Sequence, residues 1–332
     1  MSNPFSRIFT ALLVARAVAQ WPDPEPYPGN CTIHDPSLIR HTNGTYFLFG
    51  SGGNLRTAPS LSAAWTERPD PLPTGFGAPD VHLVGDTYYM YHQHDVHGTN
   101  LYSNISVASS LTMETGSWVE HANLSIPENF QQYNLIDPNL LIAPAEDNTP
   151  EKYYLSFGSY WHDIHQVNMS GPLHVSSAPI DLEYNHTTGL GLGENPSEGS
   201  FQFMWTPVAG GKRFFYLFFS SGYCCAPTYN IPPGDEYKIM VCRSENPSGP
   251  FVDAEGKSCK TENGGTLILG SHDDVYAPGG QGVLYDGSVD GGSVILYYHY
   301  IKNFKNTAHP ATFGWNKLDF DAAGWPFIKK IS

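Results

Sequence analysis

The amino-acid sequence predicts an all-β fold, a five-bladed β-propeller with four-stranded blades. Three observations predict it: a strand pattern that recurs five times, intervals long enough for two more strands after each copy, and no sustained helical periodicity. The composition agrees, because 33 glycines, 27 prolines and only 15% charged residues favour short strands joined by turns over long helices.

Each copy opens with a short strand that begins near a small or acidic residue and continues, after a turn, with an aromatic-rich strand. The paired segments are 34–38 with 46–50, 78–82 with 88–91, 136–140 with 153–157, 198–201 with 214–218, and 277–281 with 295–298. Segments such as 105–108 and 237–243 supply the remaining strands. The turn pairs Asn43-Gly44 and Gly85-Asp86 are typical of hairpins that need a positive φ.

The acids that open the first four copies are Asp35, Asp80, Asp137 and Glu198, at intervals of 45, 57 and 61 residues. A β-sandwich is the alternative fold, but a sandwich gives no reason to repeat an acid before an aromatic strand. We therefore favour the propeller.

Residues 1–20 have the features of a secretory signal peptide. Arg7 supplies positive charge, an apolar run follows it, and Ala17-Val18-Ala19 offers small residues for cleavage, although Arg16 interrupts the run. The run is far shorter than the ~20 residues of a membrane span. We therefore predict a secreted, extracellular protein with residues 21–332 as a single catalytic domain. Six N-glycosylation sequons agree with export, at Asn30, Asn43, Asn104, Asn123, Asn168 and Asn185.

The formal net charge of −15 restricts the partners of this chain. Nucleic acids and anionic membrane surfaces are polyanions that such a charge repels, so we expect neither as a partner. A neutral polysaccharide fits better, because 14% of the residues are aromatic and flat rings stack on the C–H faces of sugars. We expect a monomer.

The five cysteines show no zinc-site spacing, so we interpret them as structural. In an oxidising compartment some of them pair, and Cys242 with Cys259 is one candidate. The adjacent Cys224 and Cys225 are an unusual geometry for one bridge, and the odd number leaves one thiol over.

Four acids carry the chemical signal. The first strands of all blades line the axis in the same direction, so residues at the same place in different blades converge at one mouth. We assign that shared place to Asp35, Asp80, Asp137 and Glu198. Acids gathered in this way repel one another, which raises at least one pKa. Glycoside hydrolysis needs such a set, with one carboxylic acid to protonate the leaving oxygen and one carboxylate to activate water or attack carbon.

Motifs along nearly the whole mature chain resemble glycoside hydrolase family 43, closest to its endo-1,5-α-L-arabinanases. They are 34–37 (HDPS), 78–81 (APDV), 136–139 (IDPN), 157–161 (FGSYW) and 197–200 (SEGS), followed by 216–219 running into 224–225, then 243–244, 249–251, 264–267 and 314–326.

The resemblance implies an inverting endo-acting hydrolase of arabinan, a polysaccharide of pectin side chains. Asp35 takes the place of the general base, Glu198 that of the general acid, and Asp137 that of the carboxylate that orients the acid and modulates its pKa. For inversion the base and acid carboxyls stand roughly 6.5–9.5 Å apart. The substrate-binding residues implied are His34, Asp80, Asn139, Gly158, Ser159 and Trp161. Asp80 either contacts sugar or supports the site, with a strand-end cap as the competing interpretation, and a core-packing aromatic is the competing interpretation for Trp161.

The sequence departs from the family at the fifth blade. Many arabinanases carry a histidine after a Pro-Gly pair there, which helps to bind an ion or a water cluster on the axis. Here Gly280-Gln281 follows Pro278-Gly279, so Gln281 fills the space with an amide. We predict no cofactor and no metal ligand, and an axial ion such as calcium is not required. His92, His94 and His97 could imitate a ligand set, but surface or rim histidines are the preferred interpretation, and the roles of His162 and His165 stay open.

Two alternatives remain. An exo-acting α-L-arabinofuranosidase or β-xylosidase of the same family would close one end of the groove, which the sequence does not show. A glycan-binding propeller without activity would repeat its binding residues equally, whereas the acids here differ between blades.

Overall fold

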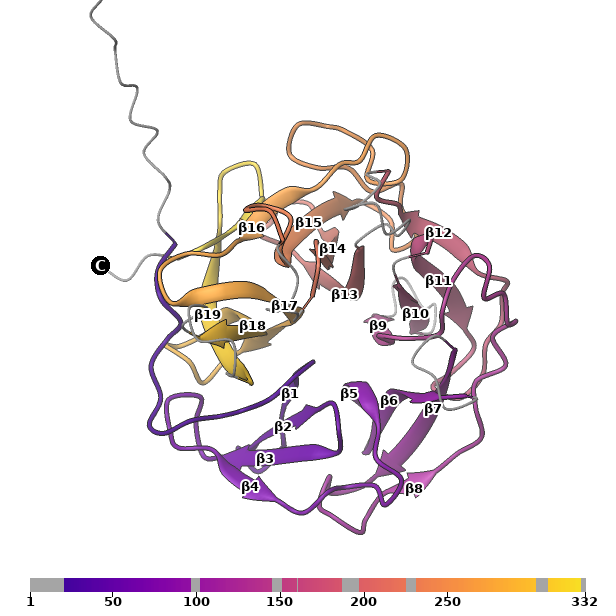
Figure 1. The fold of residues 1–332 in the computed structure, drawn as a ribbon, viewed down its shortest axis with the longest axis vertical. Coiled ribbons are helices and arrows are strands. Elements are labelled where there is room, and N and C mark those ends of the chain that lie inside the picture. The colour runs from indigo at the N-terminus through magenta and orange to yellow at the C-terminus, as the bar shows by residue number, and fades with distance from the viewer. Residues whose placement is uncertain are drawn as a thin grey trace, which may run out of the picture.

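The structure is a computed structural model that describes residues 21–96, 102–144, 151–159, 161–186, 197–224, 231–302 and 310–329, leaving aside the side chain of Ser159. Within these ranges the chain forms five four-stranded antiparallel sheets around a central axis (Figure 1). The predicted five-bladed propeller is therefore confirmed. The described ranges contain no helix, and so none that could cross a membrane. The predicted signal peptide, residues 1–20, lies outside them and stays a prediction.

The blades follow one another along the chain, and the first strand of each lies nearest the axis (Figure 1). Blade 1 contains β1 (Ser37–Arg40), β2 (Tyr46–Gly50), β3 (Asn54–Ala58) and β4 (Thr66–Arg68). Blade 2 contains β5 (Gly77–Val84), β6 (Thr87–Asp95), β7 (Ser103–Ser110) and β8 (Val119–Glu120). Blade 3 contains β9 (Asn139–Ala143), β10 (Lys152–Ser159), β11 (Asp163–Met169) and β12 (Ile180–Glu183). Blade 4 contains β13 (Ser197–Trp205), β14 (Phe214–Ser221), β15 (Lys238–Ser244) and β16 (Thr266–Leu269). Blade 5 contains β17 (Val275–Asp286), β18 (Ser293–Lys302), β19 (Ala311–Phe320) and β20 (Pro326–Ile328).

The hydrophobic core lies between neighbouring blades, because each sheet buries both of its faces. Phe49 of blade 1 packs in one cluster with Met90 of blade 2, and Tyr91 of blade 2 packs in another with Phe157 of blade 3. This explains why the second strands read as continuous aromatic and aliphatic runs, with β2 buried along its whole length.

The segment that precedes β1 closes the ring against the last blade. The backbone N–H of Ile33 donates to the carbonyl of Ala311, and that of Phe313 donates to the carbonyl of Cys31, at 3.0 and 2.8 Å. The chain therefore enters β1 along the edge of β19, which brings the residues just before β1 next to blade 5.

The cysteines behave as structural residues. Cys242 and Cys259 form a disulfide, as the sequence suggested, and Cys224 is also disulfide-bonded. Cys31 is a buried free thiol, and burial raises its pKa to about 12.

One of the six sequon asparagines, Asn185, is buried. Asn185 is only 5% exposed, and its backbone N–H donates to Oδ2 of Asp163 at 2.6 Å.

Candidate active site

Three carboxylates meet at one mouth of the axis. Asp35 lies two residues before the start of β1, Asp137 lies two residues before the start of β9, and Glu198 is the second residue of β13. The charges of Glu198 and Asp35 both act on Asp137. The backbone N–H next to Glu198, that of Gly199, donates to Oδ2 of Asp137 at 3.0 Å. Below them a narrow axial cavity of about 40 Å³ is lined by residues of all five inner strands or their approaches.

A repeated backbone feature places these acids. At the same point of each blade one residue has a positive φ, and these are Asp35 (48°), Ala78 (38°), Asp137 (51°), Gly199 (61°) and Ala277 (50°). In blades 2, 4 and 5 the strand pairing shifts there, as at a β-bulge. Proline follows the residue in four of the five blades, and proline suits a position whose N–H has no ladder partner.

This register corrects the expectation that four acids share one place. Asp35 and Asp137 do share it, but Glu198 stands one residue before it in blade 4. Asp80 stands two residues after it in blade 2, where Ala78 occupies the shared position. The mouth therefore holds three carboxylates, and Asp80 lies further along the inner strand.

Asp80 and Asn139 connect the inner strands of neighbouring blades. Asp80 is 5% exposed, and its Oδ2 accepts hydrogen bonds from His82 Nε2, Asn139 Nδ2 and the Leu140 N–H at 2.7, 3.1 and 2.7 Å. Asn139 is buried as well, and its Oδ1 accepts from the N–H of Gln202 at 2.7 Å. These contacts hold blades 2, 3 and 4 in register. Both residues also line the axial cavity, and their contact with substrate stays a prediction.

Asp35 is held ionised by its surroundings. His34 Nδ1 and Ser51 Oγ lie 2.7 and 2.6 Å from its Oδ2, while Oδ1 faces His299 Nδ1 at 3.7 Å. Burial acts to raise the pKa of Asp35, but the charge and hydrogen bond of His34, together with the Ser51 hydroxyl, outweigh it and hold this pKa well below the usual range. Burial likewise opposes the charge on His34, yet Asp35 raises the pKa of His34 above its ordinary value.

Asp137 is in the opposite situation. Burial, followed by the charges of Glu198 and Asp35, raises the pKa of Asp137 well above its ordinary value. Glu198 accepts a hydrogen bond on Oε1 from the Tyr237 hydroxyl at 3.0 Å. Simultaneous ionisation of Asp137 and Glu198 is disfavoured, because the two negative charges would repel each other. This pair therefore retains one proton at a pH at which Asp35 is already ionised.

His299, on β18, is a site residue that the sequence did not reveal. Its side chain is 1% exposed, and its ring stacks on His34 with the ring centroids 4.2 Å apart. The backbone N–H of Asp35 donates to its Nδ1 at 3.1 Å. Burial, with some help from His34, lowers the pKa of His299 to about 3, so this ring is neutral.

The fifth blade fills the axis with Gln281. Its Oε1 accepts from Ser220 Oγ at 2.7 Å and its Nε2 donates to the Gly199 carbonyl at 2.6 Å. The adjacent Gly280 is required by space as well as by its φ of 55°, because a Cβ there would lie 2.7 Å from the His299 ring and 3.1 Å from Asp35 Oδ1.

Among the described residues, His34, Cys224 and His299 form the one group of potential metal ligands. They do not fit a metal ion, because Cys224 is in a disulfide and a disulfide sulfur is not the thiolate that metals bind. The amide of Gln281, fully engaged on the axis, adds no charged ligand. We therefore derive no step through an ion.

The hairpin between β10 and β11 carries the other three residues expected at the substrate. Gly158 is irreplaceable there, since its φ is 146° and a Cβ would lie 1.8 Å from the Asp163 carbonyl. Ser159 is the last residue of β10, and Trp161 lies half-buried in the turn.

The histidines that the sequence left open are placed as follows. The ring of His162 stacks on Tyr184, and His165 is buried and pairs with Asp181 at 3.0 Å. Of the three histidines expected at the surface or rim, His92 is instead 2% exposed and His94 is half-buried, while His97 lies outside the described residues.

At one mouth of the propeller, one carboxylate is kept ionised and a neighbouring pair keeps a proton. Cleavage of a glycosidic bond requires these two groups, so the fold and the site define a β-propeller glycoside hydrolase. Residues 34–326 match the sequence model of glycosyl hydrolases family 43, and the chain belongs to that family. A glycan-binding propeller without activity is thereby set aside.

Known relatives share nearly the full length. The chain is 40% identical over 333 residues to arabinan endo-1,5-alpha-L-arabinosidase A of Aspergillus niger, which covers 95% of this chain and 97% of the relative. It is 40% identical over 341 residues to the protein of the same name from Aspergillus aculeatus, with coverages of 97% and 99%.

Solved structures agree in fold. The family 43 endo-arabinanase from Bacillus licheniformis superposes with a TM-score of 0.72 at 25% identity, covering 91% of this chain and 99% of that one. An exo-1,5-alpha-L-arabinanase from a bovine ruminal metagenomic library superposes with a TM-score of 0.74 at 23% identity, covering 92% and 100%, which shows the fold alone.

Proposed function

We propose that this protein hydrolyses α-1,5-linked L-arabinofuranosyl bonds within arabinan chains, with inversion at the anomeric carbon. The observation that carries the proposal is the opposed environment of the carboxylates at the mouth. Asp35 is kept ionised beside His34, whereas Asp137 and Glu198 together retain a proton. Inversion needs this combination of one base and one acid acting at the same time.

In this mechanism Asp35 is the general base. Its Oδ1 removes a proton from a water molecule, whose oxygen attacks the anomeric carbon. Glu198 is the general acid and gives its proton to the glycosidic oxygen as the bond from that oxygen to the anomeric carbon breaks. Asp137 acts through its contact with the Gly199 N–H and by sharing one proton with Glu198, since burial and the neighbouring carboxylates raise the pKa of Asp137 well above its ordinary value.

Endo action on arabinan is favoured by the names of the Aspergillus relatives, which are 40% identical over almost the entire chain. Exo action is the second candidate, because the sequence does not show whether a loop closes one end of the groove. Extracellular action belongs to the proposal on the strength of the leader-like residues 1–20.

Digestion of debranched linear arabinan tests the proposal. Endo action yields a series of arabino-oligosaccharides early in the reaction, exo action yields arabinose or a single short product from the start, and no product would refute the function. Proton NMR during the first turnovers shows which anomer forms first, and a product that retains the α configuration would refute Asp35 as a base and make it a nucleophile.

A further inference from the structure

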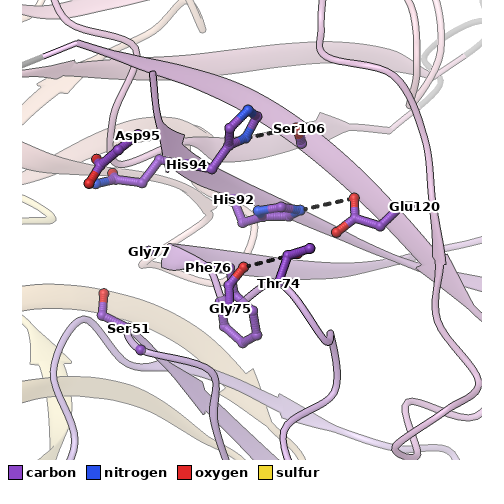
Figure 2. A pocket seen from close by; sticks show the side chains of 12 residues that line it. Ser51, Thr74, Gly75, Phe76, Gly77, His92, His94, Asp95, Ser106 and Glu120 are labelled. Atoms are coloured by element: carbon purple, nitrogen blue, oxygen red, sulfur yellow. Dashed lines mark hydrogen bonds and ion pairs between the residues drawn. The ribbon is translucent and has the colours of Figure 1, made fainter. Parts of the chain in front are cut away.

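A large pocket lies between blades 1 and 2, beside the catalytic mouth. Its volume is about 850 Å³, and it is lined by the turn after β2, by residues 74–77 at the start of β5, and by residues of β6, β7 and β8 in blade 2 (Figure 2). Because it reaches from the approach of the inner strand β5 to Glu120 on the outermost strand β8, it runs from the axis toward the rim.

The pocket begins at the catalytic carboxylates. Ser51, in its wall, donates from Oγ to Oδ2 of Asp35 at 2.6 Å. Gln93, also in its wall, accepts on Oε1 from the backbone N–H of Asp137 at 2.9 Å. A chain bound at the mouth can therefore continue directly into this pocket.

The middle of the pocket contains a buried polar side chain without hydrogen-bond partners. His92 is 2% exposed, and within the part of the chain that the structure describes neither ring nitrogen makes a hydrogen bond. Nε2 lies 3.4 Å from Oε2 of Glu120, which suffices for an ion pair (Figure 2). Leaving a buried polar group unsatisfied costs about 1–3 kcal/mol, and such a group in a pocket indicates a missing ligand.

The remaining lining identifies the chemistry of that ligand. His94, with Nδ1 3.1 Å from Ser106 Oγ, and the carboxylates of Asp95 and Glu120 offer both donors and acceptors, and the Phe76 ring adds one apolar surface. Hydroxyl groups match this mixture, since each can donate and accept, whereas an anion would face two carboxylates. The volume is within the range of pockets that hold ligands of several rings.

We propose that this pocket binds the arabinan chain beyond the cleaved bond, with sugar hydroxyls hydrogen-bonded between His92 and Glu120. The inference rests on the proposed function and adds a place for two or more neutral pentofuranose units. It explains how an enzyme with a narrow axial cavity gains affinity for a long chain.

The test compares two substrates, linear α-1,5-arabinotriose and arabinohexaose, by their kcat/KM values. In the wild-type protein the hexaose is the better substrate, because it fills the pocket. Glu120→Ala and His92→Phe each lower the hexaose-to-triose ratio about tenfold. The matched control is Glu67→Ala, a glutamate on the outermost strand of blade 1 that does not line the pocket; it keeps the wild-type ratio.

The outcomes separate the two proposals. A wild-type ratio in Glu120→Ala, whose side chain is 38% exposed and whose loss does not threaten folding, overturns the pocket assignment while the hydrolase stands. A wild-type protein that cleaves neither oligosaccharide nor arabinan overturns both. Thermal melting of each variant checks that His92→Phe is folded before its ratio is interpreted.

Discussion

The backbone N–H of Asp35, just before the first strand of the propeller, donates a hydrogen bond of 3.1 Å to Nδ1 of His299 in the last blade. A ring nitrogen that accepts a hydrogen bond carries no proton, and burial lowers the pKa of His299 to about 3, so the acceptor persists down to strongly acidic pH. The contact crosses the junction where the ring closes. It ties the position of the proposed base to the closure of the fold and makes His299 a positioning residue.

Replacing His299 should therefore reduce activity through Asp35. His299→Leu removes the acceptor and leaves a backbone N–H unpaired, which costs about 1–3 kcal/mol. We expect kcat/KM on linear arabinan to fall at least about tenfold. His299→Asn, whose Oδ1 takes the place of Nδ1, should recover much of the loss. Equal kcat/KM values for two variants that melt like the wild type would show that the acceptor is irrelevant.

The carboxylates have separate expected effects. Asp35→Asn and Glu198→Gln should each lower kcat on linear arabinan by about three orders of magnitude or more, since each removes one half of the proton-transfer machinery. Binding of arabinohexaose, measured by calorimetry, and the melting temperature should change little. Near-normal turnover in either variant would show that its assigned role is wrong.

The arrangement of blades could be predicted from sequence because each blade repeats a local pattern. The acids at Asp35, Asp137 and Glu198 were found in the same way. The sequence pattern aligns acids with one another, and it therefore misplaces Glu198 by one residue and Asp80 by two. Pro36, Pro79, Pro138 and Pro278 mark the true register, since each follows the left-handed residue that opens its blade.

Other parts of the site left no trace in the sequence. His299 stands between Tyr298 and Tyr300 in an aromatic strand, and this pattern predicts that the histidine is a residue of the hydrophobic core. Only the tertiary arrangement shows that its ring lies against His34 and Asp35. The buried state of His92 was missed for the same reason, because its burial depends on Phe76 and Glu120 from other segments.

The ion pair of His34 with Asp35 predicts an unusual acidic limb in the pH profile. The base must be ionised, and its pKa is held below the usual range, so kcat/KM should persist to lower pH than an ordinary aspartate allows. His34→Asn keeps a hydrogen-bond donor but removes the positive charge, so the pKa of Asp35 rises and the acidic limb moves up by about one pH unit. The profiles are measured on linear arabinan between pH 2.5 and 8, with His121→Gln as a histidine control outside the site. An acidic limb that stays in place would show that the charge of His34 does not act on the base.

A second buried pair, Asp163 and Glu183, lies behind the acid. Asp163 opens β11 and Glu183 ends β12, both nearly inaccessible, and the hydroxyl of Ser197 next to Glu198 donates to Oε1 of Glu183 at 3.3 Å. Within the described residues, Oδ1 of Asp163 and Oε2 of Glu183 have no hydrogen-bond partner. Burial raises the pKa of both groups, that of Glu183 to about 8.

This pair should make the folded state less stable as pH rises. A carboxyl whose pKa is higher folded than unfolded stabilises the fold fully below its unfolded value, and the contribution is lost as pH rises through the folded value. For Glu183 that window runs from the ordinary glutamate pKa of 4.5 to about 8. Glu183→Gln keeps the acceptor for Ser197 and cannot ionise, so its melting temperature should gain on the wild type across this window, by about 3 °C or more at pH 8. Exposed Glu128→Gln serves as the control and should follow the wild type. The prediction fails if the melting temperatures of Glu183→Gln and wild type differ by the same amount at pH 4.5 and at pH 8. Glu183 would then ionise in the folded protein as readily as in the unfolded chain, and burial would not raise its pKa.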